Sequence, residues 1–239
     1  SFYNGSAADG SLQTPNIDSI AQGGVVFTNG YAANAICAPS RASVMTGRYS
    51  TRFGFEYTPI FKVGPKIMDL MNRNNTAPHK IIIHHDRVDQ MKPIGDLGMP
   101  PSEITIAEML KKAGYYTAHI GKWHLGQSWD FEAEKDTFHA PTGYAKHDDT
   151  LSTDREATTE EQERWQEAFS RPTTGGPTAR GFDYYFGVDV PNWPPYCFIE
   201  NDRTVGIPSE WIPQRLCGDN LGSNLGPAMP YWHFEQLLP

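Results

Sequence analysis

Cysteine is scarce in this chain: the 239 residues include three, Cys37, Cys197 and Cys217. Three cysteines are too few for a disulfide framework, and they lack the closely spaced pairs of a zinc site. Cys197 and Cys217 could form one disulfide bond, with Cys37 left unpaired, or all three cysteines could be reduced. The sequence alone leaves both alternatives open.

Long apolar runs are also missing. No stretch approaches the roughly 20 apolar residues that cross a bilayer, so no membrane span is expected. The first residues show no signal peptide, and the chain does not begin with Met, which suggests a processed or truncated chain. The net charge is −8 and the basic residues form no stripe, so nucleic acid is not expected as a partner.

Loop-forming and aromatic residues, by contrast, are plentiful. The chain contains 22 Gly and 19 Pro, which indicates extensive turns and loops, and its 12% aromatic content can supply a core. Helical and strand-like patterns alternate, with no internal repeat and no linker that would divide domains. The sequence therefore predicts an α/β fold with a sheet between helices.

The first expected helix begins near the N-terminus. Thr14 can cap it, and Pro15 suits the first helical position, where a missing N–H is no loss. Gly23 is expected to end it, and residues 25–28 (VVFT) predict a short strand. The apolar face of this helix would be formed by Ile17, Ile20 and Ala21.

Two capping boxes predict further helix starts, Thr105 with Glu108 and Thr158 with Glu161. The second of these helices, through Phe169, is charged and is expected to present a solvated face. The first should end at Gly114, with an apolar face made of Ile106, Met109, Leu110 and Ala113.

Strands are expected at residues 115–120, and residues 181–187 (GFDYYFG) have a buried, aromatic character. Residues 80–83 could form another short strand, and residues 188–239 give no clear element. The histidines of the 79–85 region have no carboxylate or cysteine at a ligand spacing, so surface or loop positions are expected for His79, His84 and His85.

The strongest local signal is CAPSR at residues 37–41, followed by TGR at 46–48. Pro39 suits the start of a helix that Gly47 would end, which places Cys37 at the helix N-terminus. Such a thiol faces unpaired backbone N–H groups and the positive end of the helix dipole, a setting that binds oxyanions. Arg41, four residues on, lies on the same helix face and can add a fixed guanidinium.

A second signal is GKWHLG at residues 121–126. Lys122 and His124 follow a predicted strand, and an extended backbone would point both to one side. Open α/β sheets bind ligands beyond the carboxyl ends of their strands. A cation and an imidazole at this edge suit a reaction that moves a proton on an anionic substrate, whereas Trp123 between them is expected to pack in the core.

Together these segments resemble the type I sulfatases, whose motif cysteine is oxidised to formylglycine. Residues 37–41 resemble the maturation motif and residues 114–126 the second sulfatase signature, while residues 14–18 (TPNID) and 181–183 (GFD) resemble further stretches of these enzymes. The resemblance extends over roughly residues 14–200. Two motifs in the right order make it specific.

The resemblance implies the alkaline-phosphatase-like sulfatase fold, in which helices sandwich a mixed sheet, and hydrolysis of aryl or carbohydrate sulfate esters. Formylglycine derived from Cys37 would attack sulfur and later expel sulfate, with Arg41 and Lys122 holding its oxygens and the sulfate. His124 would assist the elimination. The resemblance also implies a formylglycine-generating enzyme as partner, calcium bound against residue 37, and a periplasmic, secreted or lysosomal location.

Parts of the family pattern are not found in the sequence. An Asp-Asp pair after a first strand, and a later Asp-Asn metal pair, have no counterpart, because neither Asp148-Asp149 nor Asp219-Asn220 has the expected setting. Asn192 is a weaker candidate for facing substrate. The chain is therefore interpreted as part of one catalytic domain over residues 1–239, without its first strand and its C-terminal part.

Two alternatives to a sulfatase remain. One is a phosphodiester or phosphonate monoester hydrolase of the same superfamily, which can share the formylglycine motif. The other is a truncated, catalytically inactive chain that binds calcium poorly.

Overall fold

The computed structural model describes residues 13–59, 82–90, 94–129, 156–191, 194–212 and 227–230. Two compact units are distinguished within the chain, Ser1–Ala32 and Ala33–Pro239. Residues 80 and 81 of the possible strand at 80–83 lie outside the described residues, and so do the positions of the predictions for His79, Asp148-Asp149, Asn192, Cys217 and Asp219-Asn220.

The first unit contains helix α1 (Pro15–Gly23), which confirms the expected start after Thr14. The Thr14 hydroxyl donates to Asp18 Oδ1 at 3.0 Å and does not cap a backbone N–H. None of the residues of α1 is buried, and Ile20 is 74% exposed, so the expected apolar face does not pack.

The strand predicted at residues 25–28 is wrong. Val25 and Phe27 are 78% and 84% exposed, and this described segment pairs with no strand. A high intrinsic strand preference does not form a strand without a neighbouring backbone to satisfy its hydrogen bonds.

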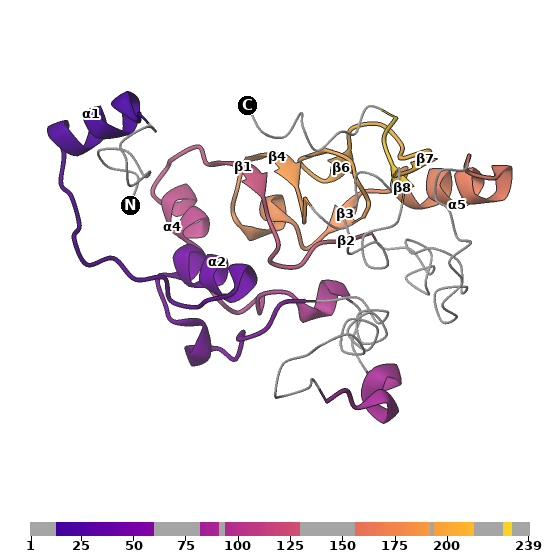
Figure 1. Ribbon diagram of the computed structural model, residues 1–239, viewed down its shortest axis with the longest axis horizontal. Coiled ribbons are helices and arrows are strands. Elements are labelled where there is room, and N and C mark those ends of the chain that lie inside the picture. The colour runs from indigo at the N-terminus through magenta and orange to yellow at the C-terminus, as the bar shows by residue number, and fades with distance from the viewer. Residues whose placement is uncertain are drawn as a thin grey trace. The chain divides into compact units, whose positions relative to one another are not determined.

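The second unit is built on a mixed four-stranded sheet in the order β1-β4-β5-β6 (Figure 1). Strands β1 (Ala118–Lys122) and β4 (Tyr184–Val188) are parallel, in register from Ala118 opposite Tyr184 to Lys122 opposite Val188. β5 (Ile199–Glu200) and β6 (Arg203–Thr204) continue the sheet antiparallel. A mixed sheet with helices confirms the predicted α/β class.

The remaining described elements are helices and short strands around this sheet. Helices α2, α4 and α5 are the longest, and two small antiparallel pairs join β2 to β3 and β7 to β8. Their bounds are α2 (Cys37–Thr46), η1 (Ser50–Arg52), η2 (His85–Gln90), η3 (Ile94–Leu97), α4 (Ile106–Lys112), β2 (Ser128–Trp129), α5 (Thr159–Phe169), β3 (Thr173–Thr174), η6 (Pro177–Arg180), β7 (Glu210–Trp211) and β8 (Pro227–Ala228).

Both capping boxes are formed as predicted. Thr105 accepts a hydrogen bond from the Glu108 N–H and Thr158 from the Glu161 N–H, and each glutamate carboxylate accepts one from the N–H of its N-cap residue. Helix α5 is solvated on one side only, because its other side buries Glu161, Trp165, Ala168 and Phe169.

The expected apolar face of α4 is wrong. Met109 is 59% exposed and Ile106 47%, whereas Ala107 is buried. The small Ala107 lies on the face of the helix that packs closely. The spacing of apolar residues in the sequence does not show which face of a helix meets a neighbouring element.

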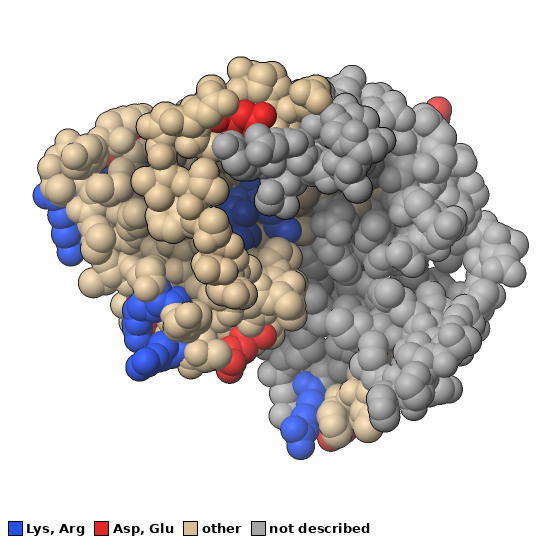
Figure 2. Space-filling view, turned by 60° about the vertical axis from the view of Figure 1, so that its left-hand side comes forward, with Lys and Arg blue, Asp and Glu red and all other residues tan. Residues whose placement is uncertain are grey.

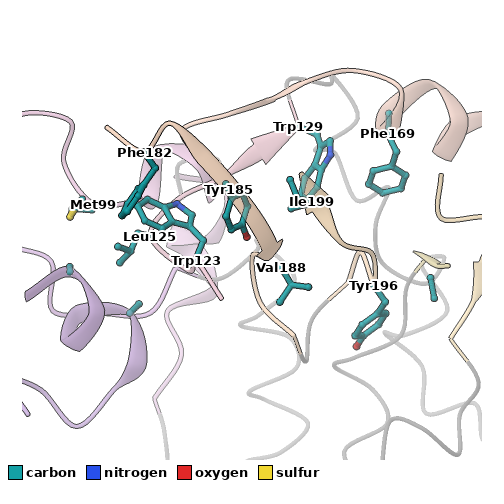
Figure 3. Packing of buried hydrophobic residues seen from close by; sticks show 14 of the residues in the cluster. Met99, Trp123, Leu125, Trp129, Phe169, Phe182, Tyr185, Val188, Tyr196 and Ile199 are labelled. Atoms are coloured by element: carbon teal, nitrogen blue, oxygen red, sulfur yellow. The ribbon is translucent and has the colours of Figure 1, made fainter. Parts of the chain in front are cut away.

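Aromatic side chains dominate the core of the second unit (Figure 3). Trp123 and Tyr185 are fully buried. The rings of Trp123 and Phe182 pack edge to face, with their centroids 6.3 Å apart. The His119 ring packs against the rings of Trp123, Phe182 and Tyr185, with centroid distances of 5.2–5.6 Å. Trp123 is thus a core residue, as predicted.

The beginning of β1 is fixed to the beginning of β4 through Asp183. Its Oδ2 accepts the Thr117 N–H at 2.9 Å and the Thr117 hydroxyl at 3.1 Å, and its Oδ1 pairs with Lys111 at 2.7 Å. At Gly181 a Cβ would lie 2.5 Å from the Glu108 nitrogen, so no larger residue fits. The GFD segment therefore aligns the parallel strand pair.

Two smaller expectations are also resolved. Cys197 is a buried free thiol, so it forms no bridge in this structure. His84 and His85 are exposed, as expected for loop histidines.

Among the described residues, no helix is both long and apolar enough to cross a membrane.

Candidate active site

Helix α2 presents Cys37 at its first position. This position and the end of the helix at Gly47, which is left-handed with φ of 65°, are as predicted, and Cys37 is exposed. The N-cap residue, Ile36, makes no side-chain capping bond. Ala38, Pro39, Ala42 and Ser43 are buried and anchor the helix. Its first turn is thereby held in place while residue 37 stays accessible.

The carboxyl end of β1 carries Lys122 and His124, in agreement with the predicted position. The strand ends at Lys122, and the Trp123 N–H still bonds the Val188 carbonyl at 2.9 Å. His124 then adopts a left-handed backbone with φ of 59°. The expectation that an extended backbone aligns the two side chains is therefore wrong, because the chain turns at His124.

The two motifs meet at the histidine ring. His124 Nδ1 lies 3.3 Å from Cys37 Sγ, joining residues 87 positions apart. His124 is 6% exposed. Burial lowers its pKa to about 4, and the positive charges of Lys122 and Arg41 act in the same direction. The imidazole is therefore neutral near pH 7 and can accept a proton.

Arg41 joins α2 to the turn that carries Lys122 and His124. Its Nε donates to the Trp123 carbonyl at 2.8 Å, and its Nη2 donates to the Lys122 carbonyl. The guanidinium was expected to face an anion, and these two donors instead hold the main chain. Burial lowers the pKa of Arg41, with Cys37, Tyr185 and Asp189 acting against the shift.

Asp189 is a residue at this edge that sequence reasoning missed. It directly follows β4, and its Oδ1 accepts the His124 N–H at 2.9 Å. Desolvation raises the pKa of its carboxyl group to about 6, against the opposing effects of that hydrogen bond, Lys122 and Arg41. The available signal was its position, because the carboxyl ends of parallel strands share one edge of a sheet.

The described residues do not supply a calcium site by themselves. Within these ranges there is no group of three or more His, Cys, Asp or Glu that could hold a metal ion. Calcium takes six to eight oxygen ligands, whereas Cys37 contacts the His124 ring and interacts electrostatically with Arg41.

Positive charge on the visible surface is local. On the face shown in Figure 2, the Lys and Arg side chains of the described residues form separate small groups, and one of these lies in a recess. A site for an anionic substrate therefore depends on particular cations near it and not on the net charge of −8.

The chain is similar to known sulfatases. The model of the family described as sulfatase matches residues 2–188. Human N-acetylgalactosamine-6-sulfatase is 38% identical over 128 residues, which are 54% of this chain and 20% of that protein. Human steryl-sulfatase is 30% identical over 182 residues, 76% of this chain and 20% of the relative.

A third relative is an arylsulfatase of Hemicentrotus pulcherrimus, 39% identical over 111 residues, which are 46% of this chain and 15% of that protein. The matched part of the chain thus spans about a fifth or less of the length of these relatives. The family match covers both motifs that meet at the Cys37–His124 contact, and the chain belongs to the sulfatase family.

Proposed function

We propose that the protein hydrolyses sulfate esters of small molecules or carbohydrates, with residue 37 as the nucleophile after conversion of Cys37 to formylglycine. Family membership supports the reaction class, and the Cys37–His124 contact carries the assignment of the site. That contact unites the only exposed cysteine of the described residues with a buried, neutral imidazole.

The position of Cys37 suits a nucleophile for an anionic substrate. It stands at the first position of a ten-residue helix whose N-cap makes no side-chain bond, where main-chain N–H groups and the helix dipole favour negative charge. Conversion to formylglycine would supply a hydrated aldehyde, whose two hydroxyls allow attack and later release of the sulfate. The oxygens would take the place of Sγ.

The chain's own residues have separate tasks in this proposal. Lys122 neutralises the oxygens of the sulfate group, and His124 accepts or returns a proton at Nδ1, the atom that faces residue 37. Arg41 adds positive charge and fixes the turn through the Lys122 and Trp123 carbonyls. Arg41 belongs to the same helix as Cys37. Its side chain therefore also fixes the distance between the motif at 37–41 and the turn that carries His124.

Several wider assignments follow from the resemblance and are part of the proposal. Residues 1–239 would form part of a single catalytic domain, with calcium held by further oxygen ligands besides the modified residue 37. A formylglycine-generating enzyme would act on Cys37, and the protein would reside in the periplasm, in a lysosome or outside the cell.

The modification is the first test. The full-length protein is co-expressed with a formylglycine-generating enzyme, and the mass of the peptide that contains residue 37 is measured, with a known sulfatase as positive control. We expect loss of the thiol mass and gain of the aldehyde. An unmodified thiol in every molecule, while the control is converted, would contradict the proposal.

The reaction class is the second test. The converted protein is assayed on matched pairs of aryl sulfate and aryl phosphonate esters. Faster turnover of the sulfate in each pair supports a sulfatase. Preference for the phosphonate would instead support a phosphonate monoester hydrolase with the same modified residue.

A further inference from the structure

The turn that carries His124 is held from two sides. Arg41 reaches it from α2 and binds the carbonyls of Lys122 and Trp123. From the neighbouring strand β4, Asp189 accepts the N–H of His124 itself at 2.9 Å. In the β1–β4 register Lys122 stands opposite Val188, so the residues just beyond each strand end are brought together.

The backbone of His124 requires such support. Its φ of 59° is left-handed, a conformation that is unfavourable for a residue with a side chain because Cβ comes too close to the following carbonyl oxygen. A strained conformation of this kind persists when surrounding contacts determine it. The hydrogen bond to Asp189 is made by the N–H of the strained residue, and the same residue turns its ring so that Nδ1 lies 3.3 Å from Cys37 Sγ.

Asp183 offers an internal comparison. It precedes β4 as Asp189 follows it, and it also accepts a backbone N–H from beside β1, that of Thr117 at 2.9 Å. Thr117 directly precedes β1, at the opposite end of the strand from Lys122. Both aspartates therefore align the strand pair, but the bond from Asp189 reaches the residue whose ring contacts Cys37.

We infer that Asp189 is a positioning residue of this site, whose carboxylate holds the His124 main chain in its left-handed turn and thereby keeps the imidazole against residue 37. The catalytic part of this inference rests on the proposed function. The geometric part, a dependence of the His124–Cys37 contact on Asp189, does not. Each part therefore has its own measurement.

The geometric measurement uses the full-length protein expressed without a formylglycine-generating enzyme, so that Cys37 keeps its thiol. The rate of alkylation by iodoacetamide is followed by mass spectrometry of the peptide containing residue 37, as a function of pH. We expect Asp189→Leu to shift the rate profile to that of His124→Ala. Asp189→Asn, whose amide oxygen can still accept the N–H, should keep the wild-type profile, and so should the control Asp183→Asn.

The catalytic measurement uses the converted enzyme. Asp189→Leu should lower kcat by roughly 10- to 100-fold with little change in KM, because misplacement of the histidine affects the reacting geometry more than binding. Asp189→Asn should restore most of the turnover. If Asp189→Leu does not fold, as judged by circular dichroism, Asp189→Ala takes its place in both measurements.

A wild-type alkylation profile in the Leu or Ala variant overturns the inference, whatever the activity. A shifted profile in a protein that turns over no sulfate ester supports the positioning role and counts against the proposed function instead. A shifted profile with unchanged kcat retains the contact and overturns the catalytic part.

Discussion

Helices α2 and α5 begin in opposite ways. α5 has a complete capping box, in which Thr158 accepts the Glu161 N–H and the Glu161 carboxylate bonds the Thr158 N–H. The same carboxylate accepts the indole N–H of Trp211 at 3.1 Å, so the cap is tied to the core. α2 begins after Ile36, which makes no side-chain cap.

This difference separates a helix end that stabilises the fold from one that is free to meet a ligand. The first N–H groups of any helix lack partners within the helix and must be satisfied by side chains, water or a bound group. At α5 the protein's own side chains satisfy the N–H groups of Thr158 and Glu161. At α2 the exposed Cys37 lies at the uncapped end, which is where an anionic substrate would be stabilised. Four predictions test this comparison, from the largest expected effect to the smallest.

Cys37→Ala in the full-length enzyme should abolish turnover, with a loss of at least about 10⁴-fold, because the nucleophile is removed. Sulfate release from an aryl sulfate is the measurement. Cys197→Ala is the matched control: that thiol is buried and should leave kcat close to wild type. Substantial activity in the Cys37 variant would move the chemistry away from the start of α2.

Lys122→Ala and His124→Ala should each lower kcat by about two to four orders of magnitude, since each acts on developing charge or on a proton in transfer. The exposed Lys112, in the last turn of α4, provides a control that should keep full activity. The melting temperature of the Lys122 variant should stay close to wild type. A near-normal rate in either variant would exclude that residue from the site.

Thr158→Ala should destabilise the protein by about 1 kcal/mol through loss of the α5 cap, without changing kcat. Chemical denaturation followed by tryptophan fluorescence measures the free energy of unfolding. Thr159→Ala, at the next position, which is also exposed, keeps the cap and should unfold close to wild type. Equal losses in the two variants would show that the cap contributes little.

Ile36→Ser should introduce at α2 the cap that α5 already has. The extended backbone of Ile36, with φ of −110° and ψ of 146°, suits an N-cap residue, and Pro39 lacks an N–H, which leaves Ala38 as the donor. We expect a gain of about 0.5 kcal/mol in unfolding free energy. KM for a sulfate ester should rise by about two- to fivefold as the new cap competes with the anion. An unchanged KM would indicate that this helix end does not meet the substrate.

Local chemistry explains why some elements could be predicted from the sequence. The capping boxes of α4 and α5 involve residues three apart, and the end of α2 at Gly47 needs a left-handed residue, so each depends on a few neighbours. The site motif at 37–41 could also be read locally, since a Pro near the start of a helix fixes where Cys37 lies. These features required no knowledge of the rest of the fold.

Burial and strand pairing could not be predicted in the same way. Residues 25–28 have a strong strand preference and form no strand, because strand formation depends on a partner elsewhere in the chain. The apolar residues Ile106 and Met109 are exposed while Ala107 is buried, since the packed face depends on what the helix meets. In both cases the deciding contact is distant in sequence.

The sequence by itself determined that Cys37 stands at a helix start and that Lys122 and His124 lie at the end of a strand, because backbone preferences act over a few residues. Only the tertiary structure decided that His124 Nδ1 meets Cys37, that Arg41 binds the carbonyls of the turn, and that Asp189 supports it. These contacts join residues 65 to 87 positions apart. They exist because the parallel pairing of β1 with β4 and the packing of α2 bring three separate chain segments to one edge of the sheet.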